Sequence, residues 1–222
     1  MSGLLVTIEG GEGAGKTTQS ALLAAALEQL GCSVLRTREP GGAPGAEALR
    51  GFLLGRDHGL SLRAEAMAHF AARIDHVDST IKPALASGRL VLCDRFTDST
   101  LAYQGYGLAR GDPAVLDFIA RLTALLDVRP ALTLMLDVRR AEGRRRVRLR
   151  GQDDDRYERL DEAFHERVAA GYRTIAAADP ARCRLIAAGD PVEAVQRRMV
   201  AAVQALLRDG PLQEGAAAPG RQ

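Results

Sequence analysis

Apolar and polar residues follow two recurring patterns along this chain. Short, almost continuously apolar runs predict strands at residues 4–9, 33–37, 90–94, 132–137 and 184–187. Elsewhere apolar residues recur every three or four positions, which predicts helices at residues 16–30, 46–54, 62–86, 113–126, 141–150, 160–178 and 191–207. A repeated strand-then-helix order is typical of a parallel β-sheet with helices on both faces.

The runs at residues 90–93 and 132–136 are apolar on both faces, so we expect them to be central strands of that sheet. In such sheets ligands bind at the carboxyl ends of the strands. Charged residues follow the predicted strands at those ends: Glu9, Arg38 and Glu39, Asp94 and Arg95, and Asp137. The sequence therefore predicts a binding site along this edge of the sheet.

Composition limits the possibilities. The chain has 222 residues, 46% of them hydrophobic, which suits one domain over residues 1–208, and the apolar-poor residues 209–222 predict a disordered tail. A net charge of +2 is too small to indicate a nucleic-acid or membrane partner. The three cysteines form no C-x-x-C pair and no apolar run is long enough to span a membrane, which favours a cytoplasmic location.

Residues 10–17 read G-G-E-G-A-G-K-T, directly after the first predicted strand, and match the phosphate-binding loop G-x-x-x-x-G-K-[ST]. In this loop backbone N–H groups surround the phosphates, Lys16 reaches the β and γ phosphates, and the Thr17 hydroxyl ligates Mg²⁺. A glycine-rich turn before a surface helix is the structural alternative. The fold we expect is the α/β, three-layer P-loop NTPase fold, with a five-stranded parallel sheet flanked by helices.

A phosphate-binding loop alone does not separate kinases from GTPases, motors and transport ATPases. Guanine-specific switches usually carry N-K-x-D, and the only lysine besides Lys16 is Lys82, in I-K-P-A, so that motif is absent. Hydrolytic ATPases usually place a glutamate beside the strand-end aspartate, but neither Asp94 nor Asp137 is followed by one. Phosphoryl transfer to an anionic acceptor requires cations instead, and arginines are abundant here.

Two segments suit such an acceptor. In F-A-A-R, helical spacing puts Phe70 and Arg73 on one face, where the ring can stack on a base and the guanidinium can bond its edge or a phosphate. A core phenylalanine beside a solvated arginine is the alternative. The segment D-R-F-T-D-S-T-L-A-Y-Q-G starts with Asp94, suited to the hydration shell of Mg²⁺, and is denser in polar groups than a plain turn requires.

Four motifs occur in order: G-G-E-G-A-G-K-T-T from Gly10, T-R-E-P-G-G from Thr37, F-A-A-R from Phe70 and D-R-F-x-x-S-T-x-A-Y-Q-G from Asp94. Together they resemble the bacterial thymidylate kinases, a family of P-loop nucleoside monophosphate kinases, over about residues 4–207. Only the first motif is widespread among unrelated NTPases. The resemblance implies transfer of the γ-phosphoryl group of ATP to dTMP, giving dTDP and ADP, with Mg²⁺ as the metal.

The resemblance also implies the residues of the site. ATP would be bound by Gly10, Gly11, Glu12, Gly13, Ala14, Gly15, Lys16, Thr17 and Thr18. The acceptor would be bound by Glu9, Arg38, Phe70, Arg73, Arg95, Ser99, Thr100, Tyr103 and Gln104. The metal would be held by Thr17 and Asp94. Catalysis would fall to Lys16, Arg95, Arg156, Arg150 and Glu12.

Within the acceptor, Phe70 would stack on thymine, and Arg73 and Gln104 would bond its polar edge. Arg95 and Arg38 would hold the phosphate of dTMP. Glu12 would accept a hydrogen bond from the sugar 3′-hydroxyl. Tyr103 would leave no room for a 2′-hydroxyl and so favour deoxyribose.

The basic run R-R-A-E-G-R-R-R-V-R-L-R-G, from Arg139 to Gly151, has three interpretations. It can be a solvated, salt-bridged helix face, a nucleic-acid surface, or part of a helical Arg-rich lid over about residues 140–157 that delivers arginines to ATP. In the family, members without an arginine in the phosphate loop take the transition-state arginine from the lid, and position 13 here is Gly13. Arg156 matches that arginine best, and Arg150 is second.

Two other functions stay open on the sequence alone. One is another P-loop (deoxy)nucleoside or nucleotide kinase with a different acceptor, and the other is a non-catalytic nucleotide-dependent switch whose Arg-rich helix docks a partner. We expect ATP and dTMP as ligands, without nucleic acid or membrane. The Ala-rich helix at residues 62–86 can present an apolar face, and the resemblance suggests a homodimer.

Overall fold

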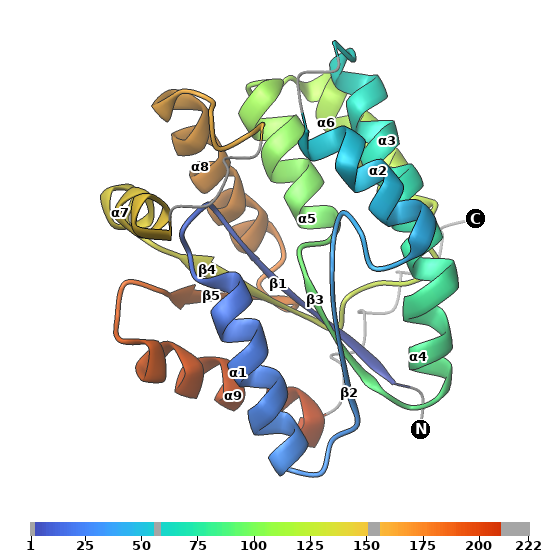
Figure 1. The fold of residues 1–222 in the computed structure, drawn as a ribbon, viewed down its shortest axis with the longest axis vertical. Coiled ribbons are helices and arrows are strands. Elements are labelled where there is room, and N and C mark those ends of the chain that lie inside the picture. Colours follow the sequence, from blue (N-terminus) through green and yellow to red (C-terminus); the bar gives the residue numbers. More distant parts are fainter. Residues whose placement is uncertain (1–2, 56–58, 151–155, 210–222) are drawn as a thin grey trace, which may run out of the picture.

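The computed structural model describes residues 3–55, 59–150 and 156–209 (Figure 1). Within these residues, five strands form one parallel sheet in the order β2-β3-β1-β4-β5. The strands are β1 (Leu4–Gly10), β2 (Val34–Arg38), β3 (Leu90–Asp94), β4 (Leu132–Asp137) and β5 (Cys183–Ala187). Each lies within about one residue of its predicted bounds, because short apolar runs bounded by polar residues mark buried strands well.

The helices are α1 (Lys16–Gln29), α2 (Pro44–Leu54), α3 (Leu62–His76), α4 (Lys82–Ala86), α5 (Thr97–Thr100), α6 (Pro113–Ala124), α7 (Arg140–Arg150), α8 (Glu162–Ala178) and α9 (Val192–Asp209), with π-helical stretches η1 (Val77–Ile81) and η2 (Leu101–Leu108). The helix predicted at residues 62–86 is α3, η1 and α4 in series. Residue 209 ends α9, and the rest of the predicted tail lies outside the described residues.

The helical pair α5 and η2 is absent from the helices predicted by the sequence. All four residues of α5 are buried and polar, and η2 buries Tyr103 and Gln104 beside two glycines. A buried face made of hydroxyl and amide side chains gives no apolar periodicity to recognise.

Helices cover both faces of the sheet. Figure 1 shows α1 and α9 together on one side, where they pack on Val6 and Ile8 of β1. The opposite face carries α3, α4 and α6 packed on Leu5 of β1, and α8 and η2 packed on Met135 of β4. Neighbouring strand residues therefore face opposite layers, and the predicted three-layer architecture is confirmed.

The strand order fixes where a ligand can bind. β1 lies between β3 and β4. The connection after β1 leads to β2 on one side of the sheet, whereas the connection after β3 leads to β4 on the other side. The carboxyl ends of β1, β2 and β3 come together there, with Ile8 and Arg38 both opposite Asp94. A crevice at such a reversal is the usual ligand site of an open α/β sheet.

A largely buried ion pair holds α5 against the residues at the start of β4 and just before β5. Asp98 accepts hydrogen bonds from two nitrogens of Arg182, at 2.6 and 3.1 Å, just before β5. Arg182 also donates to Thr133 of β4 at 2.6 Å. Because a buried carboxylate needs such partners, the segment after β3 is held firmly against the sheet.

Across the three described ranges, no helix combines the length and the apolar character that crossing a bilayer requires. Cys32, Cys93 and Cys183 are free thiols; Cys93 and Cys183 are buried, whereas Cys32 is partly exposed.

Candidate functional site

The loop between β1 and α1 folds around the side chain of Lys16, which is only 8% exposed. Its Nζ donates to the carbonyl oxygens of Gly10 and Gly11, both at 3.0 Å. Burial, followed by the positive charge of Arg95, lowers the pKa of Lys16. A buried cation beside the N-terminus of α1 is suited to an anionic ligand, and the binding of ATP by residues 10–18 stays a prediction.

The same loop touches α7 through two glycines. Gly13 has a φ of +71°, and a Cβ added there would lie 2.1 Å from the carbonyl oxygen of Gly143. A Cβ on Gly143 would lie 2.8 Å from the carbonyl oxygen of Glu12. The backbone of the loop and that of α7 are therefore in direct contact, and no arginine fits at position 13 in this arrangement.

A cavity of about 880 Å³ opens beside the loop, within the usual size range for small-molecule sites. It extends from Lys16 and Thr17 to Tyr157, in the last part of the predicted lid. The predicted acceptor residues that line it are Arg38, Arg73, Arg95, Ser99, Thr100, Tyr103 and Gln104. Two predicted acceptor residues, Glu9 and Phe70, lie behind this lining instead.

Arg95 occupies the centre of the cavity wall. Its Nη2 donates to Glu12 Oε1 at 2.9 Å and to Tyr103 Oη at 3.1 Å, and its Nη1 donates to Tyr172 Oη at 3.2 Å. The backbone of Arg95 has a φ of 71°, which is uncommon for a residue other than glycine. Such strain persists where the surroundings fix the residue, here directly after the end of β3.

Two carboxyl groups near Arg95 differ in charge state. Burial opposes ionisation of Glu12, but the charges of Arg95 and Lys16 prevail and lower its pKa to about 2. For Glu9, burial and then the charge of Asp98 raise the pKa to about 7. Glu12 is thus a carboxylate at neutral pH, whereas Glu9 takes up a proton near neutrality.

Glu9 lies behind the cavity lining and stabilises it through hydrogen bonds. Its Oε1 accepts from the Phe96 backbone N–H at 2.7 Å, and its Oε2 accepts from Ser99 Oγ at 2.5 Å and Tyr172 Oη at 3.1 Å. These bonds connect β1 to α5 and α8. The predicted contact of Glu9 with the acceptor stays a prediction.

Arg73 is buried rather than solvated, with 3% exposure. Its Nε donates to Glu39 at 2.7 Å, and its Nη2 donates to the Phe96 carbonyl at 3.0 Å and to Thr100 at 3.1 Å. Its Nη1 is buried without a hydrogen-bond partner among the described atoms. Phe70 is a core residue whose ring lies 4.6 Å from the Arg73 guanidinium, so its stacking on a base stays a prediction.

The far end of the cavity is closed by a polar cluster. The Gln104 amide nitrogen donates to Glu65 at 3.0 Å and to Tyr157 at 2.8 Å, and Tyr157 Oη donates to Glu65 at 2.7 Å. His69 Nε2 lies 2.9 Å from the same hydroxyl. Arg156 pairs with the other oxygen of Glu65 at 2.8 Å.

The structure therefore places Arg156 beside Glu65 of α3, which also bonds the predicted acceptor residue Gln104. Its role as a transition-state arginine stays a prediction, and it requires the ion pair with Glu65 to open. The side chain of Arg150, the second candidate, lies outside the described residues.

The arginines of α7 are largely ion-paired. Arg140 and Arg144 pair with Glu162, at 3.0 and 2.9 Å, and Arg145 and Arg146 pair with Glu142, both at 2.8 Å. This arrangement agrees with a salt-bridged helix face and leaves the lid hypothesis untested.

A hydroxyl and a carboxylate meet at the metal position that the sequence predicts. Thr17 Oγ1 donates to Asp94 Oδ2 at 3.3 Å, and Asp94 Oδ1 is buried without a partner in the described part of the chain. Hard oxygen ligands next to a phosphate-binding loop fit a divalent cation.

Sequence reasoning missed four residues of the site, namely Glu39 as the partner of Arg73, Glu65, Tyr157 and Tyr172. Glu65 carries a usable signal, since it is an acid on the same helical face as His69 and Ala72, which α3 buries. Tyr172 carries none, because it contacts Ser99 from a helix far along the chain.

Several known proteins are similar to this chain in sequence or fold. A family model described as Thymidylate kinase matches residues 8–199. The thymidylate kinase of Gluconobacter oxydans is 54% identical over 201 residues, or 90% of this chain and 94% of the relative. That of Rhizorhabdus wittichii is 47% identical over 216 residues, or 93% and 100%. A crystal structure of thymidylate kinase from Ehrlichia chaffeensis has a TM-score of 0.72 and 33% identity, covering 92% of this chain and 99% of that one.

Replacing Glu9 tests the consequence of its raised pKa. The ordinary pKa is 4.5 and the folded value is about 7, so the carboxyl contributes stability below pH 4.5 that is lost as the pH rises through 7. Glutamine keeps the shape without the charge. The melting temperature of Glu9→Gln should exceed that of the wild type by roughly 3–6 °C at pH 8.

This difference should shrink steadily as the pH is lowered towards 5, measured by circular dichroism in four buffers. Glu28→Gln, an exposed position on α1, is the matched control. A difference independent of pH would contradict the raised pKa.

Proposed function

Because this chain belongs to the thymidylate kinase family, it transfers the γ-phosphoryl group of ATP to dTMP, and we propose that the transfer occurs in the cavity beside Lys16. An oxygen of the dTMP phosphate attacks the γ-phosphorus, the bond to the β–γ bridging oxygen breaks, and dTDP and ADP result. One observation carries the proposed location: Lys16 and seven of the nine predicted acceptor residues line the same cavity.

We assign the ends of this cavity by their charges. The buried cation of Lys16 takes the triphosphate, and Arg95 with Arg38 takes the phosphate of dTMP. Glu12, ionised and held by Tyr103, accepts the 3′-hydroxyl, and the ring of Tyr103 occupies the space of a 2′-hydroxyl. Bringing two anions together over fixed cations is the main requirement of phosphoryl transfer.

Thymine is recognised at its polar edge by one donor and one acceptor. The unpartnered Nη1 of Arg73 supplies the donor for the O4 carbonyl. Gln104 uses its amide nitrogen on Glu65 and Tyr157, so its oxygen is turned to accept from the ring N3–H. Cytosine presents the opposite pattern and would leave both groups unpaired.

A kinase of this type requires a divalent metal, and we propose Mg²⁺. Thr17 and Asp94 would hold it, and the ion would neutralise charge on the phosphates. The chain also supplies Lys16 on the same phosphates, so both cations act on the donor nucleotide.

We propose the cytoplasm as the site of the reaction. The three cysteines are free thiols, which are typical of proteins in a reducing compartment.

The exposed face of α3 supports the proposed homodimer. Met67 and Ile74 are 55% and 44% exposed, and Ala71 lies between them at helical spacing. A continuous apolar stripe on a surface helix is typical of a protein interface.

A nucleotide panel tests the assigned reaction. With ATP and Mg²⁺, dTMP should be phosphorylated faster than dUMP, dCMP, dGMP or AMP in a coupled ADP-release assay. Lys16→Met should lower kcat by 10²-fold or more because the cation on the phosphates is lost. Lys82→Met is the matched control, since this lysine pairs with Asp78 and Asp127 on the surface. Faster turnover of another monophosphate would favour the alternative kinase.

The kinetic constants of Arg156→Ala distinguish two roles for that residue. As the transition-state arginine it should lower kcat by 10²-fold or more while the KM for dTMP stays nearly unchanged. An unchanged kcat with a raised KM for dTMP would instead make it a structural partner of Glu65. Arg159→Ala, the next arginine along the chain, is the control.

Placing a charge on α3 tests the homodimer. Met67→Lys should shift the protein to monomer in sedimentation velocity, because an unpaired ammonium would be buried at the interface. Leu22→Lys, at a similarly exposed position on α1, should leave the assembly state unchanged. If both variants sediment identically, the prediction that α3 forms the dimer interface is contradicted.

A further inference from the structure

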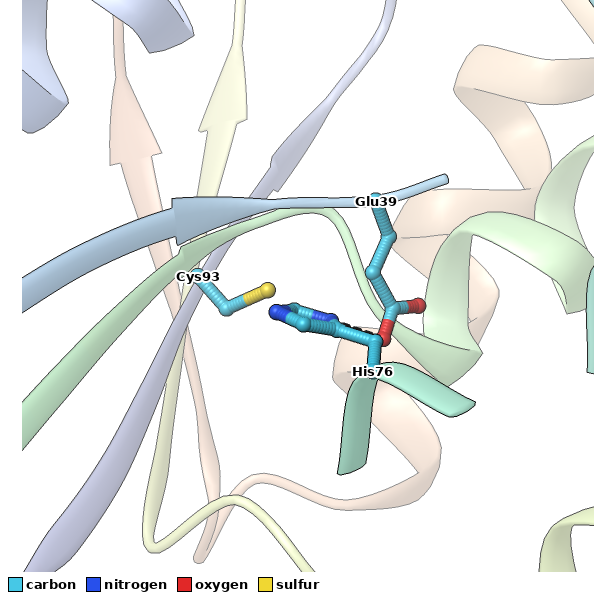
Figure 2. Close-up of side chains that lie close together, drawn as sticks. All are labelled: Glu39, His76 and Cys93. Carbon is cyan, nitrogen blue, oxygen red and sulfur yellow. Dashed lines mark hydrogen bonds and ion pairs between the residues drawn. The ribbon is translucent and has the colours of Figure 1, made fainter. Parts of the chain in front are cut away.

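Next to Arg73 lies a cluster of three buried side chains, Glu39, His76 and Cys93 (Figure 2), and Glu39 is the member that contacts Arg73. Glu39 directly follows β2, His76 is the last residue of α3, and Cys93 lies on β3. One ligand-type atom from each falls within 4.8 Å of the others. Neither the motifs nor the proposed function gives His76 a role.

The donor set resembles a metal site, but its atoms are already engaged. Glu39 Oε2 accepts from Arg73 Nε at 2.7 Å, and Glu39 Oε1 lies 3.1 Å from His76 Nδ1. Cys93 Sγ donates to the Arg95 carbonyl oxygen at 3.1 Å. A cation among them would also face the buried guanidinium of Arg73, so the cluster is better suited to hydrogen bonding than to a metal.

Four side chains, Thr37, His76, Glu39 and Arg73, form one continuous series of polar contacts. Thr37 Oγ1 lies 2.7 Å from His76 Nε2, His76 Nδ1 contacts Glu39, and Glu39 contacts Arg73. Because a carboxylate accepts hydrogen bonds, the imidazole hydrogen belongs on Nδ1, and Nε2 accepts from the threonine hydroxyl. Each carboxylate oxygen of Glu39 thus has one donor, and the carboxylate is fixed from two sides.

The loop after β2 closes over the imidazole. Gly42 has a φ of +84°, and a Cβ there would lie 2.3 Å from His76 Nε2. Gly42 is the second glycine of T-R-E-P-G-G, and glycine is required there because any side chain would displace the imidazole ring. The histidine is held as firmly as the carboxylate that it contacts.

We propose that His76 is a positioning residue for recognition of the acceptor base, acting through Glu39 on Arg73. The proposal rests on the proposed function, which puts Arg73 at the O4 edge of thymine. Without His76, one buried oxygen of Glu39 loses its donor, the carboxylate turns to find another, and Arg73 loses its fixed orientation. The phosphate loop and Arg95 receive no contact from His76, so the chemical step is spared.

The base specificity follows from the same chain of contacts. The Arg73 donor matches the O4 carbonyl shared by dTMP and dUMP and opposes the amino group of dCMP. Loosening Arg73 should therefore reduce the preference for dTMP over dCMP. The preference for dTMP over dUMP depends on the 5-methyl group and should stay as it is.

The test compares His76→Leu, His76→Asn and His76→Gln with the full-length wild type. His76→Leu should raise the KM for dTMP about fivefold to twentyfold, with kcat and the KM for ATP within about twofold. Asparagine places its amide nitrogen near the position of Nδ1 and should restore most of the affinity. Glutamine reaches the position of Nε2 instead and should restore little.

Val77→Ala is the matched control for lost stability, since Val77 is a buried neighbour in the apolar cluster around Phe70. It should melt at a lower temperature without a change in the KM for dTMP. A wild-type KM in both His76→Leu and His76→Gln, or equal KM values for the asparagine and glutamine variants, would overturn the positioning role.

One equivalent of zinc retained by the wild type and lost from His76→Asn would overturn the proposal in favour of a metal site. Failure of the wild type itself to phosphorylate dTMP would reject the proposed function instead, and so the two failures are distinguishable.

Discussion

The partly buried guanidinium of Arg95 is the interaction on which the rest of this site depends. A cation that loses much of its water must find partners, and those of Arg95 come from separate parts of the chain: Gly10 and Glu12 in the phosphate loop, Tyr103 in η2 and Tyr172 in α8. The loop, the segment after β3 and the helix that covers it are therefore assembled around one charge. The strained backbone at this residue is held in place by the same contacts. An incoming phosphate would meet a cation that is already oriented and would compete with Glu12 for it.

The two carboxyl groups beside this cation show how position decides charge. Glu12 faces Arg95 and Lys16 and stays ionised, whereas Glu9 lies beneath them, close to the carboxylate of Asp98, and holds its proton to a higher pH. The difference keeps the number of negative charges near the centre low, which favours the binding of two anionic nucleotides. Glu9 also joins β1, α5 and α8 through its hydrogen bonds to Phe96, Ser99 and Tyr172.

Much of this arrangement is predictable from the sequence, and the remainder has physical reasons for escaping prediction. The strands and the phosphate loop are local features, written in consecutive residues, and they appear where expected. The α5–η2 segment was missed because its buried face is polar, and Arg156 lies beside Glu65 through a pairing across 91 positions of the chain. Phe70 shows the limit of a motif, since F-A-A-R gives the helical face shared with Arg73 but does not tell whether the ring faces a ligand or the core. Contacts between residues far apart in the sequence leave no periodic pattern from which they could be predicted.

The contact between Gly13 and Gly143 has a mechanical consequence. With no side chain on either residue, the phosphate loop and the first turns of α7 meet as two rigid backbones without a compressible layer between them. A small outward displacement of the loop would push α7 directly, and a rotation of α7 would press on the loop in return. The position of the loop and the orientation of the arginine-bearing helix are thus coupled through a single backbone contact, without a need for any longer route of communication.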